Sequence, residues 1–313
     1  MIVTITMNPT VDKSSAVDRL VPEKKLRCSN IYTEAGGGGI NVSKALKELG
    51  EDSHALFPAG GGNGRLLKQL LTAKQIPYTA ISSGNNTRES FNITENVTRA
   101  QYRFIMPGEE LPARAVAACL HALKAMDPFP SVIVASGSLP TGIPADFYAT
   151  VAQIANKRGA RLILDTSGEP LTLALKAGLF MIKPNLSELQ ALTGHSCATM
   201  PTVLKAARKV LHRYRCEVVV VSMGAAGALL TTRDTHYAIC APAAKRISTS
   251  GAGDSMVAGI TWMLQQEKSW QEVLQFGVAC GTAATLNAGT QLFKKADVTK
   301  LYEQIKTDHA VQV

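Results

Sequence analysis

The segment STSGAGDSMVAGI, residues 248–260, joins a run of small residues to an apolar stretch with an aspartate at the junction. Gly251, Ala252 and Gly253 let successive backbone N–H groups point at one spot, and the positive end of a helix beginning near Asp254 adds to it. Such an anion hole suits the negative charge that develops during phosphoryl transfer. Asp254 should stay ionised beside the helix N-terminus and could take the proton of an attacking hydroxyl.

The same aspartate has a plainer interpretation. Asp is a favoured helix cap, and a cap needs no catalytic role. On local grounds the cap is the more frequent case, although a cap does not require the three small residues that precede Asp254. Both interpretations stay open on this segment alone.

A second glycine run, AGGGGINVSKALKELG at residues 35–50, lacks the common nucleotide fingerprints. The dinucleotide pattern G-x-G-x-x-G, started at Gly36, requires glycine where Asn41 stands, and no glycine precedes Lys-Ser or Lys-Thr as in a P-loop. The run does offer backbone that a ligand can approach closely before a helix N-terminus, with the Asn41 amide beside it. A flexible loop before an ordinary helix is an equal alternative.

Short runs rich in Val and Ile end in polar or glycine residues at 132–138, 162–169, 180–188 and 218–224. Helix-like segments lie between them, which predicts the βαβ alternation of a doubly wound, mainly parallel α/β sheet. In such sheets ligands bind outside the carboxyl ends of the strands. The candidate residues at these ends are Ser138, Asp165, Lys183, Asn185 and Ser222.

Two segments, roughly residues 12–35 and 88–106, do not fit this alternation. They contain short strand-like runs of mixed polar and apolar residues, which favour a small antiparallel flap over a core sheet. No repeat or linker divides the rest of the chain. We therefore expect one domain spanning residues 1–313, with these segments inserted as a lid.

The composition, 46% hydrophobic and 18% charged over 313 residues, is that of a soluble globular protein. No apolar run approaches the roughly 20 residues of a membrane helix, the N-terminus is unlike a signal peptide, and the six cysteines form no C-x-x-C pair. These features predict a cytoplasmic protein that does not span a membrane. The net charge of +9 suits binding of nucleic acid or of small anionic ligands. The basic residues are dispersed along the chain and only 5% of residues are aromatic, which favours small ligands.

Several motifs occur in a family-like order: TMNPTVD, GGGGINVSKAL, SGSLPTG, KPNLSE, VVSMGAAGAL and GAGDSMVAG. Over nearly the whole chain they resemble the ribokinase-like, phosphofructokinase B-type carbohydrate kinases. The run Gly36 to Asn41, with KLRC at 25–28 and FPAGG at 57–61, is similar to the 6-phosphofructokinase type in the phosphosugar branch. The resemblance implies a doubly wound sheet flanked by helices, with a small β-sheet lid.

The activity implied is ATP-dependent phosphorylation of the 1-hydroxyl of fructose 6-phosphate to fructose 1,6-bisphosphate, a glycolytic step. Tagatose-6-phosphate kinase and 1-phosphofructokinase are the alternatives in the same branch. An NAD-dependent oxidoreductase would share the α/β architecture, but the failed dinucleotide fingerprint at Asn41 counts against it. The resemblance also implies a homodimer formed through the lid.

The resemblance assigns Asp254 as general base, with Gly251, Ala252 and Gly253 as the anion hole. Residues matching sugar-phosphate contacts are Asp12, Lys25, Arg27, Gly38, Gly39, Asn41, Arg88, Arg103 and Ser138. Residues matching ATP contacts are Lys183, Asn185, Ser222, Gly224, Gly227 and Asn287. Local alternatives are a turn residue for Asp12 and solvated strand residues for the two lid arginines, Arg88 and Arg103.

Two cation sites are also implied. Glu188 completes an N-x-x-E element with Asn185 and would hold Mg²⁺ through water, and ATP itself calls for a divalent ion to neutralise its phosphates. The local alternative for Glu188 is a first-turn glutamate favoured by the helix dipole. The resemblance places a monovalent cation, potassium, near Ser248, Ser250 and Gly289.

Overall fold

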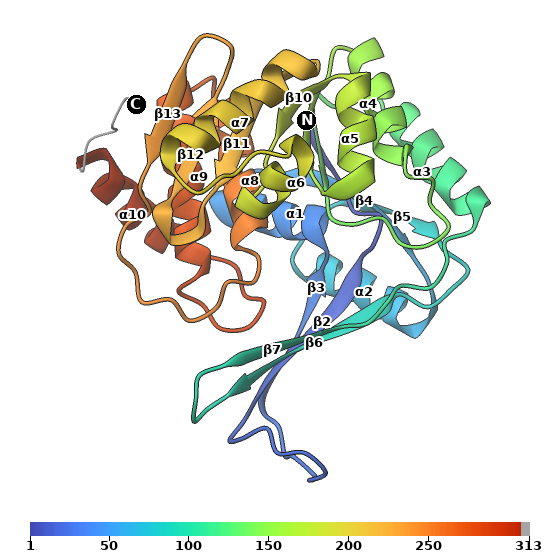
Figure 1. The fold of residues 1–313 in the computed structure, drawn as a ribbon. Helices are drawn as coiled ribbons and strands as arrows, with labels where there is room; N and C mark the ends of the chain where they lie inside the picture. Colours follow the sequence, from blue (N-terminus) through green and yellow to red (C-terminus); the bar gives the residue numbers. More distant parts are fainter. Residues whose placement is uncertain (308–313) are drawn as a thin grey trace.

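The computed structural model describes residues 1–307. Its centre is a nine-stranded sheet in the order β13-β12-β11-β10-β9-β8-β1-β4-β5 (Figure 1). Seven of these strands run parallel: β1 (Ile2–Ile5), β4 (Ser53–Ala59), β5 (Tyr78–Ser82), β8 (Val132–Ser136), β9 (Arg161–Asp165), β10 (Leu179–Ile182) and β11 (Cys216–Ser222). Strands β12 (Ala228–Thr231) and β13 (His236–Ile239) continue the sheet antiparallel at one edge.

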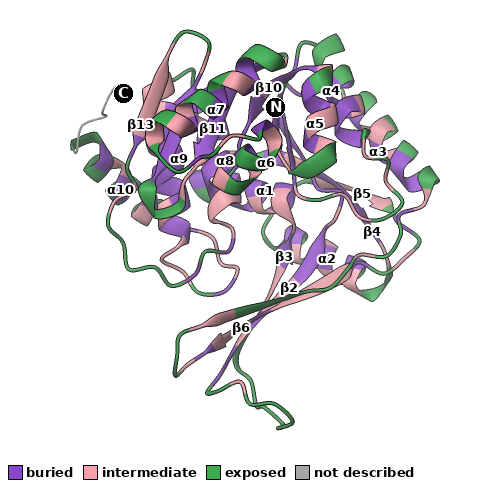
Figure 2. Cartoon of the chain, in the orientation of Figure 1, coloured by how far each residue is buried: buried purple, intermediate pink, exposed green. Residues whose placement is uncertain are grey.

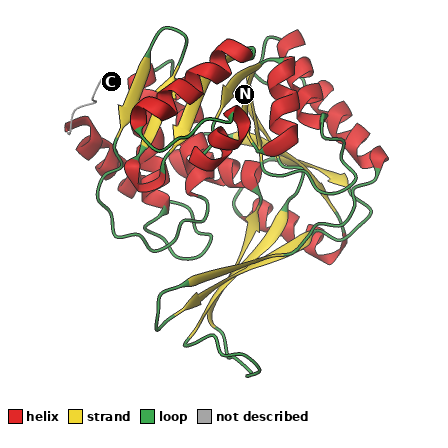
Figure 3. Cartoon of the chain, in the orientation of Figure 1, coloured by secondary structure: helices red, strands yellow, loops and turns green. Residues whose placement is uncertain are grey.

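Helices cover both faces of this sheet (Figure 3). One face packs against α3 (Ala113–Lys124), α4 (Phe147–Lys157), α5 (Gly168–Ala177), α6 (Leu186–Thr193) and α7 (Met200–Arg213). The other face packs against α1 (Gly38–Leu49), α8 (Ala252–Gln265), α9 (Trp270–Ala284) and α10 (Lys295–Thr307). Helix α2 (Gly61–Ala73) packs beside β4, and η1 (Gly224–Ala226) follows β11.

The central strands are mainly apolar because both faces of the sheet are buried (Figure 2). In β8, Ile133 and Ala135 contribute to the core under α3–α7, whereas Val132 and Val134 contribute to the core under α1 and α8–α10. This alternation explains why the run showed no polar face in the sequence. No helix within residues 1–307 combines the length and apolar character needed to cross a bilayer.

A separate four-stranded sheet has the order β3-β2-β6-β7 and projects away from the body of the molecule (Figure 1). Its strands are β2 (Thr10–Val17), β3 (Ser29–Gly36), β6 (Arg88–Glu95) and β7 (Gln101–Ile105). The expectation of a purely antiparallel flap was wrong, because β2 and β6 pair in parallel. Both strands leave the same carboxyl edge of the central sheet, after β1 and after β5, so they run in the same direction.

The glycine run at the start of α1 permits a close approach to β1. A Cβ atom at Gly39 would lie 2.6 Å from the Ile5 carbonyl oxygen and 2.6 Å from Thr6 Oγ1. Thr6 Oγ1 already accepts a hydrogen bond of 2.8 Å from the Ile40 N–H. The Ile5 backbone and the Thr6 hydroxyl therefore leave no room for a side chain at this position.

Substitution Gly39→Ala should therefore lower the free energy of unfolding by about 1–3 kcal/mol, because the backbone must shift to relieve the overlap. Urea denaturation followed by circular dichroism measures the loss. The matched control is Gly62→Ala, at an exposed helical position where the nearest heavy atom would be 4.0 Å from the new Cβ. Equal stability of the two variants would contradict the packing argument.

Candidate active site

The N-termini of α1 and α8 meet the carboxyl ends of β8 and β9, and Asp254 lies at this meeting point. Helix α8 begins after Gly251, whose φ of 71° is in the left-handed region that favours glycine. Asp254 is the third residue of the helix, and the N-cap position makes no side-chain hydrogen bond. The interpretation of Asp254 as a plain helix cap is therefore wrong.

Both carboxylate oxygens of Asp254 are held by side chains from other elements. Asn41 Nδ2, in α1, donates a hydrogen bond of 2.9 Å to Oδ2. Ser136 Oγ, at the end of β8, donates one of 3.1 Å to Oδ1. The carboxylate is thereby fixed in orientation, and each oxygen keeps a lone pair for another donor.

Burial raises the pKa of Asp254 to about 6, with a further contribution from the nearby Asp165 carboxylate. The hydrogen bonds from Asn41 and Ser136 and the charge of Lys183 act in the opposite direction. The end of the helix favours the ionised form, but desolvation, which depends on the tertiary packing around Asp254, has the larger effect. A pKa near 6 leaves the group mostly ionised at neutral pH and basic enough to accept a proton.

Lys183 places a positive charge beside the anion hole. Its Nζ lies 3.2 Å from an Asp165 carboxylate oxygen, and a Cβ at Gly253 would lie only 3.5 Å from the same nitrogen. Burial by itself would lower the pKa of Lys183, but Asp165, Asp254 and Glu188 outweigh it and raise the pKa. The ammonium group therefore stays charged where the α8 N-terminus also presents positive charge.

Three cavities meet at residues 251–254. The first, about 200 Å³, is called the basic cavity here, and Gly251 lines it together with Asp12, Asn41, Arg88 and Arg103. The second, about 610 Å³, is the apolar cavity, and Ala252 and Gly253 line it. The third, about 450 Å³, is the acidic cavity, lined by Asp165, Glu188 and Asp254 among others.

Polar atoms in the basic cavity lack partners. Among residues 1–307, the buried side-chain atoms without a hydrogen bond include Asn41 Oδ1, Arg88 Nε and Asn92 Oδ1, and all three residues line this cavity. Buried polar atoms are normally paired, because an unpaired one costs free energy. These atoms therefore indicate a ligand that supplies both hydroxyl donors and anionic acceptors.

The two lid arginines are held differently. Arg88 donates to the carbonyl oxygens of Asn8 at 3.1 Å and Met106 at 3.3 Å. Arg103 is exposed and donates to Thr249 Oγ1 at 2.9 Å. The small sheet thus contacts the segment that leads into α8, so its position bears directly on the anion hole.

Asp12 is fixed from two sides. Burial raises its pKa, whereas the charges of Lys44 and Arg88 lower it. A Cβ at Gly36 would lie 2.0 Å from Asp12 Oδ2, so only glycine leaves space for the carboxylate. Lys44 is buried in α1, and its Nζ donates to the Ala35 carbonyl at 2.9 Å.

Other predicted sugar contacts are less central. Lys25 and Arg27 are exposed in the loop between β2 and β3, at the far end of the small sheet, and do not line the basic cavity (Figure 2). Ser138 is exposed and lines the acidic cavity together with Gly38, and Asn8 Nδ2 donates to its Oγ at 3.2 Å. Within one chain, the structure therefore does not bring Lys25 and Arg27 to the other candidates.

The predicted nucleotide contacts fall into two groups. Ser222, Gly224 and Gly227 line the apolar cavity beside Met256 and Val278. The remaining three, Lys183, Asn185 and Asn287, do not line it. The Asn287 amide instead donates to the Ala283 carbonyl at 3.3 Å.

Asn185 and Glu188 form a capping box at the start of α6, with both hydrogen bonds at 2.9 Å. Glu188 is thus a first-turn helix residue, as the local alternative for it predicted. Glu188 nevertheless lines the acidic cavity together with Asp254. The same residue therefore caps helix α6 and lies beside the candidate active site. Within residues 1–307, no group of three or more His, Cys, Asp or Glu side chains is placed to hold a metal by itself.

The three residues of the predicted monovalent-cation site do come together. Ser248 Oγ donates to the Gly289 carbonyl at 2.9 Å, and the Ser250 N–H donates to Ser248 Oγ at 3.2 Å. All three residues are buried. Oxygen atoms of these residues therefore lie close together near the N-terminus of α8, and oxygen atoms are the ligands that a hard cation requires.

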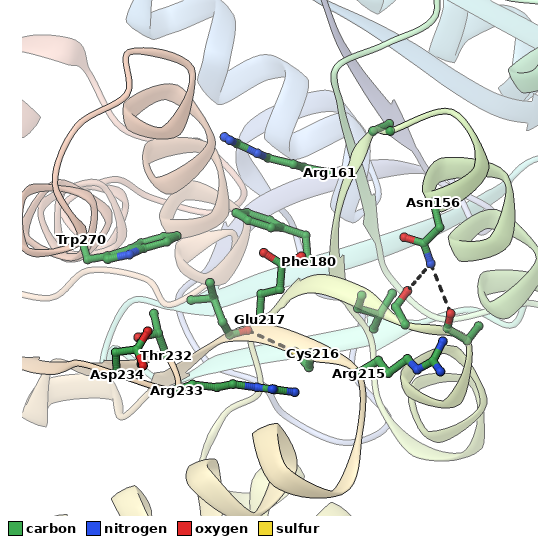
Figure 4. A pocket seen from close by; sticks show the side chains of 16 residues that line it. Asn156, Arg161, Phe180, Arg215, Cys216, Glu217, Thr232, Arg233, Asp234 and Trp270 are labelled. Atoms are coloured by element: carbon green, nitrogen blue, oxygen red, sulfur yellow. Dashed lines mark hydrogen bonds between the residues drawn. The ribbon is translucent and has the colours of Figure 1, made fainter.

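A larger cavity, about 760 Å³, lies at the amino ends of β9, β10 and β11 (Figure 4). Arg161, Phe180 and Trp270 line it, and the Arg161 guanidinium lies 5.2 Å from the centre of the Phe180 ring. This is the opposite edge from Asp254, and ligands of parallel sheets bind at the carboxyl edge. Size alone therefore does not identify the site.

Sequence reasoning missed two residues that support the candidate site, Ser136 and Lys44, and one ion pair, between Asp165 and Lys183. Ser136 precedes Ser138 by two positions and bonds Asp254, while Lys44 lies beside Asp12. Asp165 was noticed as a strand-end residue, but its pairing with Lys183 was not foreseen. The available signal for Ser136 was its position as a polar residue at the carboxyl end of a Val- and Ile-rich strand.

Residues 2–297 match the family described as pfkB family carbohydrate kinase. ATP-dependent 6-phosphofructokinase isozyme 2 of Mycobacterium tuberculosis is 41% identical over 302 residues, which cover 96% of this chain and 89% of that protein. Phosphofructokinase-2 of Escherichia coli in complex with substrates and products is 37% identical with a TM-score of 0.93, over 97% of this chain and 99% of that one. The same enzyme in complex with potassium gives 37% identity and a TM-score of 0.92 with the same coverage.

These similarities extend over nearly the whole chain and far exceed a resemblance of fold alone. They confirm the ribokinase-like architecture expected from the motifs, with its mainly parallel sheet, flanking helices and small additional sheet. The chain belongs to the pfkB family of carbohydrate kinases.

Proposed function

We propose that this chain transfers the γ-phosphoryl group of ATP to the 1-hydroxyl of fructose 6-phosphate, giving fructose 1,6-bisphosphate and ADP. Its relatives of 37–41% identity carry the name 6-phosphofructokinase isozyme 2. The observation that carries the proposal is the position of residues 251–254, where the basic, apolar and acidic cavities meet. A sugar phosphate, an adenine ring and a chain of phosphates need such different surroundings within reach of one base.

In the transfer, Asp254 accepts the proton of the 1-hydroxyl as that oxygen bonds to the γ-phosphorus. The bond between the γ-phosphorus and the bridging oxygen of ADP breaks. The N–H groups of Gly251, Ala252 and Gly253 and the Lys183 ammonium stabilise the charge on the transferring group. Asn41 keeps its hydrogen bond from Nδ2 to Asp254, which leaves Asn41 Oδ1 free to accept a hydrogen bond from a sugar hydroxyl.

The basic cavity binds the sugar phosphate. Asp12 and Asn41 contact hydroxyl groups, and Arg88 and Arg103 bind the 6-phosphate, which suits the planar guanidinium donors of arginine. Residues 12–35 and 88–106 act as the lid of one kinase domain. Closure excludes water that would otherwise compete for the phosphoryl group.

The cations bind at separate places. Glu188 would hold Mg²⁺ through water, because the carboxylates that line the acidic cavity are not placed to enclose a metal ion by themselves within residues 1–307. Bound there, the ion would neutralise phosphate charge. Ser248, Ser250 and Gly289 would hold a monovalent cation, in keeping with the E. coli relative described in complex with potassium.

The small sheet also supports a homodimer. Large apolar side chains on β3 and β7 are solvent-exposed, including Ile31 at 68% and Ile105 at 70%, with Tyr32, Tyr102 and Phe104 nearby in sequence. A monomer seldom leaves so many apolar groups together on one small sheet. Pairing of the lids of two chains would cover these side chains, which lie on the two edge strands of the sheet.

Substitution Asp254→Asn should reduce kcat by several orders of magnitude, because the amide cannot accept the proton, while KM for ATP changes little. Steady-state kinetics with coupled detection of ADP measures both constants. The exposed Asp234→Asn is the matched control, since that residue lies at the opposite edge of the sheet. Near-normal turnover of Asp254→Asn would remove the base from the proposal.

Substitutions Arg88→Ala and Arg103→Ala should each raise KM for fructose 6-phosphate by about 10- to 100-fold, the loss of one charge-assisted contact, with KM for ATP much less affected. Arg65→Ala, on the exposed surface of α2, is the matched control. Arg88 also donates hydrogen bonds to two carbonyl groups, so its removal could destabilise the fold. The thermal stability of the Arg88→Ala variant must therefore be compared with that of Arg103→Ala. Unchanged KM values in both variants would refute the phosphate contact.

The substrate assignment is tested by comparing four acceptors in the ADP-release assay. Fructose 6-phosphate should give the highest kcat/KM, ahead of tagatose 6-phosphate and fructose 1-phosphate, and unphosphorylated fructose should be the poorest because it brings no phosphate to the two arginines. Comparable rates on all four would contradict a dedicated phosphate site. A preference for another phosphosugar would retain the kinase and replace the substrate.

A further inference from the structure

Ser136 connects the end of β8 to the active-site carboxylate. Its side chain is 2% exposed, and its Oγ donates to Asp254 Oδ1 at 3.1 Å. This is the one side-chain hydrogen bond that Ser136 makes within the described residues 1–307. Asn41 donates to the other oxygen of the same carboxylate at 2.9 Å, so the two donors grip Asp254 from two different elements.

We propose that Ser136 is a positioning residue, which fixes the orientation of Asp254 and favours its ionised form. The inference rests on the proposed role of Asp254 as the base. Asn41 is expected to touch the sugar as well, whereas the Ser136 hydroxyl is directed at the carboxylate. Ser136 also lines the acidic cavity, but its one hydroxyl proton is donated to Asp254, so we infer that it acts on the reaction through that carboxylate.

The packing around Ser136 supports a dedicated role for its hydroxyl. A Cβ at Gly38 would lie 2.1 Å from Ser136 Oγ and 2.8 Å from the Ser136 carbonyl carbon. Glycine at this position lets the first turn of α1 rest directly on the end of β8 without displacing the hydroxyl. The glycine run thus serves the base as well as the ligand, by keeping open the space that the serine occupies.

Charged groups surround Asp254 on several sides. Asp165 from β9, Lys183 after β10 and Lys44 from α1 all interact with it electrostatically, and Glu188 lines the same cavity. Burial and Asp165 favour the protonated carboxyl, whereas Lys183 and the two hydrogen bonds favour the carboxylate. Removal of the Ser136 hydroxyl leaves the four charged groups in place and deletes one hydrogen bond to the ionised form.

Loss of that hydrogen bond should raise the pKa of Asp254. In wild type, kcat/KM should fall as pH drops through about 6, where Asp254 becomes protonated and can no longer accept a proton. In Ser136→Ala this acid limb should move upward by roughly one pH unit, which corresponds to a roughly threefold loss near pH 6.5. At pH 8.5 most of the loss should be regained, and KM for ATP should be unchanged.

Two further variants separate this role from general packing. Ser136→Cys leaves no cavity but donates only weakly through its thiol, so it should shift the profile in the same direction. Ser43→Ala is the matched control, since Ser43 is also fully buried and bonds Thr4 and Ser53 at 2.8 Å, away from Asp254. It should lower thermal stability and leave the pH profile unmoved.

Combination with Asp254→Asn distinguishes failure of this inference from failure of the proposed function. If Ser136 acts through Asp254, Ser136→Ala should have no further effect on kcat once Asp254 is replaced. An acid limb identical to that of wild type in both Ser136 variants would overturn the positioning role alone. Near-normal turnover of Asp254→Asn would instead overturn the base on which it rests.

Discussion

The structure depends on the burial of one carboxylate where two helix N-termini meet the carboxyl ends of parallel strands. Taking Asp254 out of water favours its neutral form, yet a base has to be ionised. Two hydrogen bonds and the Lys183 ammonium offset part of that desolvation, and their donors come from α1, β8 and the end of β10. The arrangement therefore requires the helices and strands to approach within side-chain reach, and glycines at the helix starts permit this approach.

The charges around this carboxylate form a connected set. Lys183 is paired with Asp165, so the ammonium group is held beside the anion hole and not drawn fully onto Asp254. Asp12 has a comparable environment on the sugar side, between Lys44 and Arg88. Each carboxylate near the reaction thus has a nearby cation, as is necessary when several charged groups share a partly buried region.

The small sheet couples substrate binding to the same region. Two side-chain hydrogen bonds join the sheet to the segment before α8, one from Arg103 to Thr249 and one from Asn92 to Ser250. Movement of the sheet should therefore shift the residues of the anion hole. The parallel pairing of β2 with β6 gives the sheet two attachments to the carboxyl edge of the body.

The sequence by itself determined the alternation of buried strands and helices, the glycine-flanked aspartate, and the order of motifs that indicated the family. These signals are local, because periodicity and short motifs depend on neighbouring residues. Tertiary structure alone decided the parallel pairing within the lid, the pKa of Asp254 near 6, and the convergence of Ser136, Asn41 and Lys183 on its surroundings. Residues 41, 136, 183 and 254 are far apart in the chain, and desolvation depends on what packs around a group, so neither could be read from local pattern.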